Sequence, residues 1–219
     1  MLLGLPGAGK GTQAALLAAA AGVPHIATGN IFRQAVAESA PLGLQVRAIL
    51  ESGGLVPDEL TIAIVEERLL RADCRAGFVL DGFPRTVAQG EALDALLQRA
   101  GTPLQRAVLL EISEERVVDR ISGRRACTQC GATYHVEADP PAPGDLCRRC
   151  GQPVLQRPDD RPEVQRSRVA AYRRDTAPLL QYYGRHGRLL RVDGDRPLSD
   201  VTAELQQRLS GASEGGSAG

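Results

Sequence analysis

The sequence predicts an α/β protein with a central parallel sheet of five strands flanked by helices. Short apolar runs alternate with helical patterns along most of the chain, which is typical of strand–helix–strand units. A glycine-rich turn at residues 4–12 joins the first apolar run to the first helix. Residues 125–157 break the alternation with glycines, prolines and four cysteines, which indicates a small separate unit.

Five apolar runs are the expected strands, because parallel strands covered on both faces favour continuous apolar runs. They cover residues 1–3, 25–27, 77–80, 106–111 and 188–192. The third run is followed directly by Asp81, at the carboxyl end of its strand. Three residues precede Gly4, so we expect a short first strand.

Helical patterns fill the intervals between these runs. The expected helices cover residues 10–21, 31–37, 42–52, 58–71, 86–100, 113–123, 162–183 and 198–209. Ser113 is an expected N-cap, because a serine hydroxyl can accept a hydrogen bond from the free N–H groups of a first turn. The tail at residues 211–219 is rich in Gly, Ser and Ala, and we expect it to be disordered.

The composition excludes several classes of protein. The chain has 219 residues, enough to bury a core, and its 26 basic residues balance 26 acidic ones. Zero formal charge argues against a general binder of nucleic acids or anionic membranes. No run of 18 apolar residues occurs, so a transmembrane helix is not expected. The start lacks signal-peptide features, and we expect a reducing cytoplasm.

The basic residues are unevenly distributed. Residues 116–196 carry a net charge of +6 and residues 1–115 a net charge of −4, so the neutral total hides a basic segment suited to a polyphosphate. Twenty-five of the basic residues are arginines, and Lys10 is the one lysine. A coding bias explains arginine in place of lysine in general. For Arg148, Arg149 and Arg188 we expect only a solvated surface role.

The turn at residues 4–12 has the features of a phosphate-binding loop. Glycines let backbone N–H groups point at phosphate oxygens, the helix N-terminus adds partial positive charge, and Lys10 would reach the β- and γ-phosphates. The general motif places Ser or Thr directly after the lysine, whereas here Gly11 stands between Lys10 and Thr12. A chance glycine-rich turn is the alternative, and the flanking strand and helix argue against it.

The cysteines predict a metal site. Two C-x₂-C pairs separated by sixteen residues have the spacing of a structural zinc site with four protein ligands, which would stabilise a segment too small for its own core. The ligands would be Cys127, Cys130, Cys147 and Cys150. A redox dithiol is one alternative, iron is a chemically possible metal, and a nucleic-acid-binding zinc ribbon is disfavoured because Tyr134 is the segment's single aromatic residue. Cys74 is expected to be an ordinary buried thiol.

Several strings together resemble the adenylate kinase family. Residues 4–13, Gly-Leu-Pro-Gly-Ala-Gly-Lys-Gly-Thr-Gln, are similar to its phosphate loop, and Asp81-Gly82-Phe83-Pro84-Arg85-Thr86, with Gln89 beyond, is similar to its most distinctive string. Further matching strings, in chain order, are residues 28–33, 54–58, 119–125, 134–136, 157–160 and 166–168. The resemblance covers roughly residues 1–210.

The resemblance implies a P-loop nucleoside-monophosphate-kinase fold, with a helical AMP-binding insertion and a small zinc-bearing β lid on the five-stranded parallel sheet. The implied division is a core at 1–29, 60–124 and 159–210, the AMP-binding insertion at 30–59, the zinc lid at 125–158, and the disordered tail at 211–219. The implied reaction is reversible phosphoryl transfer from MgATP to AMP, giving two ADP.

Phosphoryl transfer depends on positioning and on cations, and an arginine fork binds phosphate oxygens bidentately. By resemblance, the catalytic residues are Lys10, Arg85, Arg120, Arg124, Arg157 and Arg168. The ATP-binding residues are Gly7, Ala8, Gly9, Lys10, Gly11, Thr12, Arg120, Arg124, Thr133, Tyr134 and Arg196. The AMP-binding residues are Thr28, Arg33, Gly54, Leu55, Val56, Gly82, Phe83, Pro84, Arg85, Gln89, Arg157 and Arg168.

The resemblance also implies a magnesium ion, and two positions of this sequence differ from the residues usual in the family. Mg²⁺ would bridge the ATP phosphates, with Asp81 and Thr12 as ligands through water; for Asp81 a strand-end cap is the rival role. Asn30 stands where the family usually has Asp, and Gly54 where Lys is common. His135 would lie near adenine or serve lid packing.

ATP, AMP and ADP are the expected partners of a monomer with no nucleic-acid or membrane partner. Thr28 and the long lid favour AMP over a pyrimidine monophosphate. The alternatives are a kinase of another nucleoside monophosphate, a GTP-dependent AMP kinase, and a non-catalytic zinc protein that binds nucleotides or nucleic acids.

Overall fold

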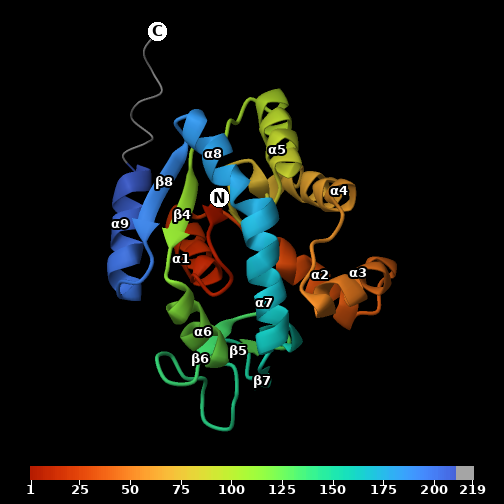
Figure 1. Cartoon of the computed structure of the whole chain (residues 1–219), viewed down its shortest axis with the longest axis vertical. Helices are drawn as coiled ribbons and strands as arrows, with labels where there is room; N and C mark the ends of the chain where they lie inside the picture. Colours follow the sequence, from red (N-terminus) through yellow and green to blue (C-terminus); the bar gives the residue numbers. More distant parts are fainter. Residues whose placement is uncertain (211–219) are drawn as a thin grey trace.

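A parallel sheet of five strands, in the order β2–β3–β1–β4–β8, forms the centre of the molecule (Figure 1). The computed structural model describes residues 1–210, so the tail expected to be disordered lies outside the described residues. The strands are β1 (Leu2–Leu3), β2 (His25–Ala27), β3 (Val79–Asp81), β4 (Ala107–Glu111) and β8 (Leu189–Asp193). The predicted α/β fold with five parallel strands is confirmed.

The register brings three strand ends to one edge of the sheet. Leu2 of β1 pairs with Asp81 of β3 on one side and with Val108 of β4 on the other, while Ala27 of β2 also pairs with Asp81. The chain therefore leaves β1, β2 and β3 at neighbouring points. In open parallel sheets this carboxyl edge is where ligands bind.

Helices cover both faces of the sheet (Figure 1). They are α1 (Lys10–Ala21), α2 (Thr28–Ala37), α3 (Pro41–Ser52), α4 (Asp58–Leu69), α5 (Val87–Arg99), α6 (Glu114–Ser122), α7 (Pro162–Ala171), α8 (Pro178–Arg185) and α9 (Leu198–Ser210). Nearly all bounds agree with the predicted ranges. Helix α2 begins three residues earlier than predicted, because the chain turns into it directly after the extended Ala27.

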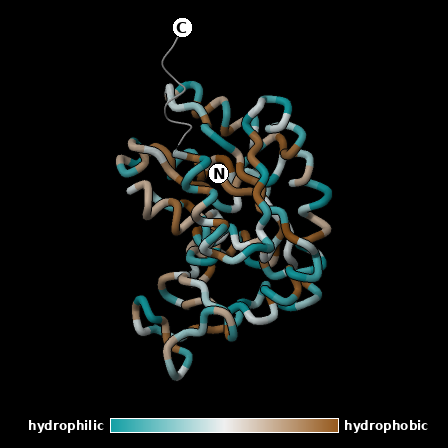
Figure 2. Tube along the Cα trace, turned by 90° about the vertical axis from the view of Figure 1, so that its left-hand side faces the viewer, coloured by the Kyte–Doolittle hydropathy of each residue, from teal (hydrophilic) through white to brown (hydrophobic). Residues whose placement is uncertain are grey.

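Alternate residues of the central strands pack into two separate cores. Leu3 and Leu109 face a cluster with α5 and α8, whereas Leu2, Val108 and Leu110 face a cluster with α1 and α9. This follows from the period of two along a strand. Figure 2 shows the hydrophobic colour concentrated along these inner segments.

Local capping explains where several helices begin and end. The predicted N-cap is confirmed, since the Ser113 hydroxyl accepts a hydrogen bond from the N–H of Arg116. The helix predicted at residues 162–183 is interrupted by a π-helical turn, Tyr172–Thr176, before α8. Pro178 has no N–H to donate to the preceding turn, which accounts for a wider turn at this point.

Two excursions leave the sheet. Helices α2 and α3 form a hairpin with its own cluster of Phe32, Val46 and Val56. The lid contains an antiparallel sheet in the order β6–β5–β7, formed by Thr133–His135, Arg124–Cys127 and Val154–Leu155. The small β unit expected in this segment is therefore present. No helix among the described residues has the length and apolar character needed to span a membrane.

A close crossing of α2 and α3 generates the first prediction. A Cβ at Gly43 would overlap the backbone carbonyl of Ala35, whereas a Cβ at the helical Gly184 would meet only Leu189 Cδ2, at 3.9 Å. We expect Gly43→Ala to destabilise the protein by about 1–3 kcal/mol, since neither backbone can yield. Gly184→Ala should be neutral or stabilising by up to about 1 kcal/mol. Urea denaturation of both variants tests this, and equal effects would contradict it.

Candidate active site

The phosphate loop, residues 4–12, is held open by glycines. Gly4, Gly7 and Gly9 have φ values of 140°, 82° and 87°, which L side chains rarely adopt. Helix α1 begins at Lys10, and its Nζ donates to the carbonyl oxygens of Gly4 and Leu5, both at 2.8 Å. The loop is therefore curled around the ammonium group, next to the first free N–H groups of a helix.

Asp81 stands beside the loop at the end of β3. A Cβ at Gly11 would lie 3.2 Å from Asp81 Oδ2, so the small residue after Lys10 leaves space for this carboxylate. His25 Nε2 lies 3.6 Å from the same oxygen. Burial raises the pKa of Asp81, but His25 and Lys10 outweigh it and hold the pKa below its ordinary value. Asp81 is therefore ionised and available to a cation or to water.

Five arginines from distant parts of the chain converge near Lys10. They are Arg33 of α2, Arg85 after β3, Arg124 of β5, Arg157 before Pro158, and Arg168 of α7. Asp159 and Asp160 hold this group in place. Arg168 donates to Asp159 Oδ2 at 2.6 Å, and both nitrogens of the Arg124 fork bind the buried Asp160, Nε at 2.9 Å.

These carboxylates do not balance the charge of the cluster. Five arginines and Lys10 face three carboxylates, Asp81, Asp159 and Asp160. Burial and repulsion between arginines lower the pKa of Arg85 to about 10 and that of Arg157 to about 9. Burial lowers the pKa of Lys10 to about 7. The cluster therefore has a surplus of buried positive charge that a phosphate would relieve.

A pocket opens from this cluster toward α2 and α3. Nine of the predicted AMP-binding residues line it: Thr28, Arg33, Gly54, Leu55, Val56, Gly82, Arg85, Gln89 and Arg168. Phe83, Pro84 and Arg157 are not among the lining residues, and Phe83 is instead buried in the core under the sheet edge. An apolar slot thus leads to a cationic end, which suits a flat base joined to a phosphate.

Sequence reasoning missed further lining residues, namely Gly29, Phe32, Leu50, Gly53, Thr61 and Asp159. Phe32 and Asp159 lie within strings that were recognised, so adjacency to Arg33 and Arg157 was an available signal. Leu50 and Thr61 are buried or half-buried helical residues that carry no distinctive pattern. Leu50 comes from α3, which packs against α2 and α7, and Thr61 comes from α4, which packs against α5, so only the tertiary packing brings them to the pocket.

Two of the residues predicted to bind ATP, Arg120 of α6 and Arg196, lie toward α6 and α9. Arg120 donates to the carbonyl of Gly194 at 2.8 Å, and its Nη1 would lie 3.8 Å from a Cβ at Gly9. Arg196 donates to Glu204 of α9 at 2.5 Å. The nucleotide contact of Arg196 stays a prediction, since this guanidinium already has a partner.

The turn that contains Gly131 lies close to α2. A Cβ at Gly131 would lie 3.3 Å from Asn30 Nδ2, while Asn30 Oδ1 accepts from Arg33 at 2.6 Å. A neutral Asn thus accepts from a site arginine and lies beside the turn of Gly131. At the base of the lid the ring of His135 covers Gly123, where any side chain would overlap it. His135 therefore has the lid-packing role that was one of its two expected roles.

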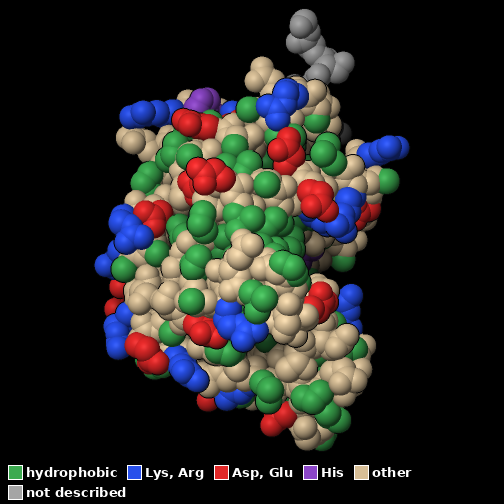
Figure 3. All heavy atoms as spheres, turned by 90° about the vertical axis from the view of Figure 1, so that its right-hand side faces the viewer, with side chains coloured by type: hydrophobic (Ala, Val, Ile, Leu, Met, Phe, Trp, Pro, Cys, Tyr) green, Lys and Arg blue, Asp and Glu red, His purple; other side chains and the backbone are tan. Residues whose placement is uncertain are grey.

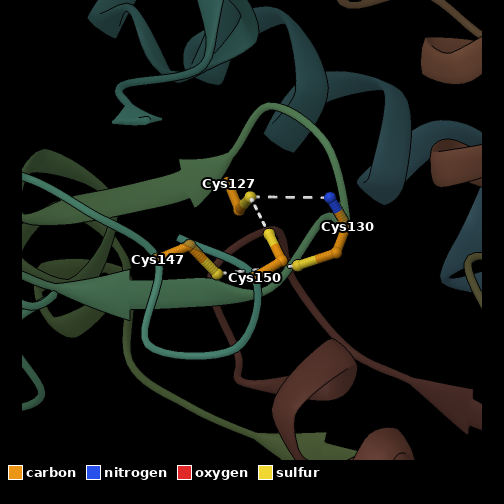
Figure 4. A group of neighbouring side chains, drawn as sticks. All are labelled: Cys127, Cys130, Cys147 and Cys150. Carbon is orange, nitrogen blue, oxygen red and sulfur yellow. Dashed lines mark hydrogen bonds between the residues drawn. The ribbon is translucent and has the colours of Figure 1, made fainter. Parts of the chain in front are cut away.

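Four cysteine side chains converge from two turns of the lid (Figure 4). The sulfurs of Cys127 and Cys150 are 3.4 Å apart, those of Cys130 and Cys147 are 3.6 Å apart, and all four lie within 4.8 Å of one another. Thiolates around a tetrahedral zinc, with bonds of about 2.3 Å, stand about 3.8 Å apart. The donor set and its spacing therefore fit a four-coordinate metal ion.

Neighbouring donors lower the pKa of Cys147 and Cys127, whereas burial raises the pKa of Cys130 and the nearby Cys127 sulfur raises that of Cys150. The hydroxyl of Tyr134 lies 3.1 Å from Cys147 Sγ, and the N–H of Arg149 also donates to it. The Tyr134 hydroxyl is the main cause that lowers the pKa of Cys147 to about 6. Tyr134 is buried among the cysteines, so its side chain serves this cluster, and its predicted contact with ATP stays a prediction.

A curled phosphate loop at the edge of a parallel sheet, a cationic pocket and a lid define a nucleotide phosphotransferase with the nucleoside-monophosphate-kinase fold. A model of the family "Adenylate kinase" matches residues 2–188. Among similar proteins is the adenylate kinase of Moorella thermoacetica, 46% identical over 95% of this chain and 96% of the relative. Those of Geobacillus sp. (strain WCH70) and Bacillus subtilis (strain 168) are each 44% identical over 96% of this chain, and over 98% and 97% of the relatives. The chain belongs to the adenylate kinase family.

The lowered pKa of Lys10 leads to a prediction about proton uptake when a ligand binds. Burial lowers the pKa of Lys10 to about 7, and a bound polyphosphate should raise it. The bound form would then hold a proton that the free form has partly lost. Relative to a variant without this lysine, in which the ligand's own titration is the same, binding at pH 7.5 should therefore take up about 0.5–1 proton more. Titration calorimetry with inorganic tripolyphosphate, in buffers of different ionisation enthalpy, measures this uptake.

Lys10→Met is the matched control, because it keeps a straight side chain of similar length without the charge. It should fold normally, lose the proton uptake and abolish turnover. An unchanged uptake, or near-normal turnover, would contradict the assigned role of Lys10.

Proposed function

We propose that the protein catalyses reversible phosphoryl transfer from MgATP to AMP, giving two molecules of ADP. The observation that carries this proposal is the surplus of buried cations between the phosphate loop and the AMP pocket. Two nucleotides bring a large negative charge to one place, and the migrating group spreads further charge over its oxygens. A cluster with more cations than carboxylates is matched to that charge.

Each cation has a role that suits its position. Lys10 and the loop N–H groups would hold the β- and γ-phosphates of ATP, with Arg120 and Arg124 gripping the same phosphates from the lid side. Arg33 and Arg85 would hold the AMP phosphate at the pocket's charged end. Arg157 and Arg168 would reach both nucleotides at the transferred group.

Closure of the lid over the pocket would exclude water. This matters because water would otherwise accept the phosphoryl group. The contact between the lid turn and Asn30 supports such closure, because it joins the lid to the AMP-binding insertion. Asp159 and Asp160 would keep the arginines pointed inward until phosphates replace them as partners.

Two metal ions belong to this proposal. Mg²⁺ would neutralise ATP phosphates, and Asp81 and Thr12 are the residues proposed to hold it through water. Zinc would occupy the four cysteines as a structural ion, because four protein ligands leave no open coordination position. Its part would be to fix the lid strands.

We further infer a monomer that works in a reducing cytoplasm, without nucleic-acid or membrane partners. Five free cysteines, four of them grouped as metal ligands, suit a compartment that keeps thiols reduced. Acidic and basic side chains are interspersed on the face seen in Figure 3. This mixture of charges does not favour the binding of a polyanion along that face.

A panel of nucleoside monophosphates, each offered as the phosphoryl acceptor, tests the proposed reaction. With MgATP and a coupled ADP assay, AMP should give a kcat/KM well above those of UMP and CMP, and ATP should exceed GTP as donor. The reason is that Thr28 and the long lid favour AMP over a pyrimidine monophosphate. AMP no better than UMP or CMP would favour another nucleoside-monophosphate kinase. No ADP at all, with tight salt-dependent oligonucleotide binding, would favour a non-catalytic binding protein.

Metal analysis tests the lid site. We expect one zinc per chain in protein purified under reducing conditions, and chelation should lower the melting temperature more than it lowers activity at low temperature. The physical reason is that the lid core is small, so the metal supplies much of its stability.

Cys130→Ser should lose the zinc, whereas Cys74→Ser should keep it, because Cys74 lies apart from the cluster and contacts Arg68. Zinc-free protein would overturn the four-ligand site, and iron in its place would change only the metal assigned.

A further inference from the structure

The amide of Gln89 is held from two sides in the wall of the pocket. Its Nε2 donates to Asp58 Oδ1 at 2.7 Å, and its Oε1 accepts from the backbone N–H of Arg85 at 2.8 Å. The side chain is almost fully buried, and it lines the pocket together with Thr28 and Gly82. A carboxamide in this position faces any ligand that enters the pocket and cannot turn freely.

The chemistry of the two neighbours fixes which way the amide faces. A carboxylate only accepts hydrogen bonds, and a backbone N–H only donates. If the amide turned over, its NH₂ group would face the Arg85 N–H and its oxygen would face the Asp58 carboxylate. Both contacts would then be repulsive. Asp58 and the Arg85 amide therefore allow one orientation of Gln89.

A fixed orientation leaves a fixed pattern of free groups. Each amide atom uses one of its two hydrogen-bonding capacities on the protein, so one N–H donor and one oxygen acceptor remain. Adenine presents an acceptor at N1 beside a donor at its 6-amino group. A 6-oxopurine presents a donor at N1 beside an acceptor at O6. The free groups of Gln89 can pair with the adenine edge in one fixed order, whereas the other edge requires the amide turned over.

Asp58 is itself well anchored. It lies in the first turn of α4, where a carboxylate is favoured by the free N–H groups. Its second oxygen accepts from the Thr86 hydroxyl at 2.8 Å, and that hydroxyl in turn accepts from the N–H of Gln89 at 3.1 Å. The carboxylate thus ties the start of α4 to the start of α5, where Gln89 lies.

We infer that Asp58 is a positioning residue that fixes the amide of Gln89 and thereby sets the preference of the acceptor site for a 6-aminopurine over a 6-oxopurine monophosphate. The inference rests on the proposed transfer to AMP, whose acceptor pocket Gln89 lines. Asp58 acts through Gln89 and is not itself a catalytic residue. A site that hydrogen-bonds one pattern rejects the opposite one strongly, because its buried polar groups are left unpaired.

The experiment compares AMP with IMP as acceptors for wild-type protein and for Asp58→Ala and Asp58→Asn. We expect Asp58→Ala to lower the ratio of kcat/KM for AMP to that for IMP by about tenfold or more, through a higher KM for AMP. Asp58→Asn should give an intermediate loss, since an amide can still offer one acceptor. A purely structural role would instead lower the kcat/KM for AMP and the kcat/KM for IMP equally, and would leave their ratio unchanged.

Two controls make the result specific. Glu59→Gln removes an exposed acid from the same first turn of α4, and it should leave the ratio unchanged. In a Gln89→Ala background, Asp58→Ala should change the ratio no further, because the group through which it acts is gone. Melting temperatures establish that each variant is folded, and the milder Asp58→Asn carries the test if Asp58→Ala does not fold.

The outcomes separate this inference from the proposed function. Wild-type protein that forms no ADP from AMP would overturn the proposed reaction. Wild-type protein that prefers AMP, with an unchanged ratio in both Asp58 variants, would overturn the role of Asp58 alone. A further fall of the ratio in the Gln89→Ala background would also overturn it.

Discussion

The surplus of buried positive charge beside the phosphate loop is the constraint on which the rest of the structure depends. Cations brought together from β5, α2, α7 and the end of β3 repel one another and lose their hydration. Asp159 and Asp160 reduce this cost by pairing with Arg168 and Arg124, yet they leave charge uncompensated. Several elements together hold the cluster, and phosphate groups would neutralise its remaining positive charge.

The two excursions from the sheet, the α2–α3 hairpin and the segment of β5, β6 and β7, each carry a piece of that cluster. Strand β5 begins at Arg124, which pairs with Asp160, and ends at Cys127, one of the four cysteines. A metal at the cysteines would thus stiffen the same short strand that presents the arginine. On the opposite side, Arg33 and Asn30 lie one helical turn apart, so one helix contacts both the cluster and the lid turn. The cysteine cluster and the cation cluster are thus joined by one short strand.

Much of the fold followed from local patterns. The apolar runs, the glycine-rich turn and the Ser113 cap fixed the strands, the phosphate loop and the start of α6, because each depends on neighbours in sequence. The break in the long helix before α8 was not foreseen, since a π-helical turn depends on how Pro178 is accommodated by the surrounding packing. The start of α2 was misplaced for a similar reason, because propensity says little about a chain that turns directly out of a strand.

The sequence by itself determined the kinds of group in the site: a phosphate loop with its single lysine, a set of arginines, and two cysteine pairs at metal-ligand spacing. Tertiary structure decided which of them meet. It placed Asp159 and Asp160 against the arginines, gave the Tyr134 hydroxyl to the cysteine cluster, and brought Asp58 of α4 onto the Gln89 amide of α5. Composition and spacing report charge and local geometry, whereas pairing across 31 residues from Asp58 to Gln89 depends on how two helices pack.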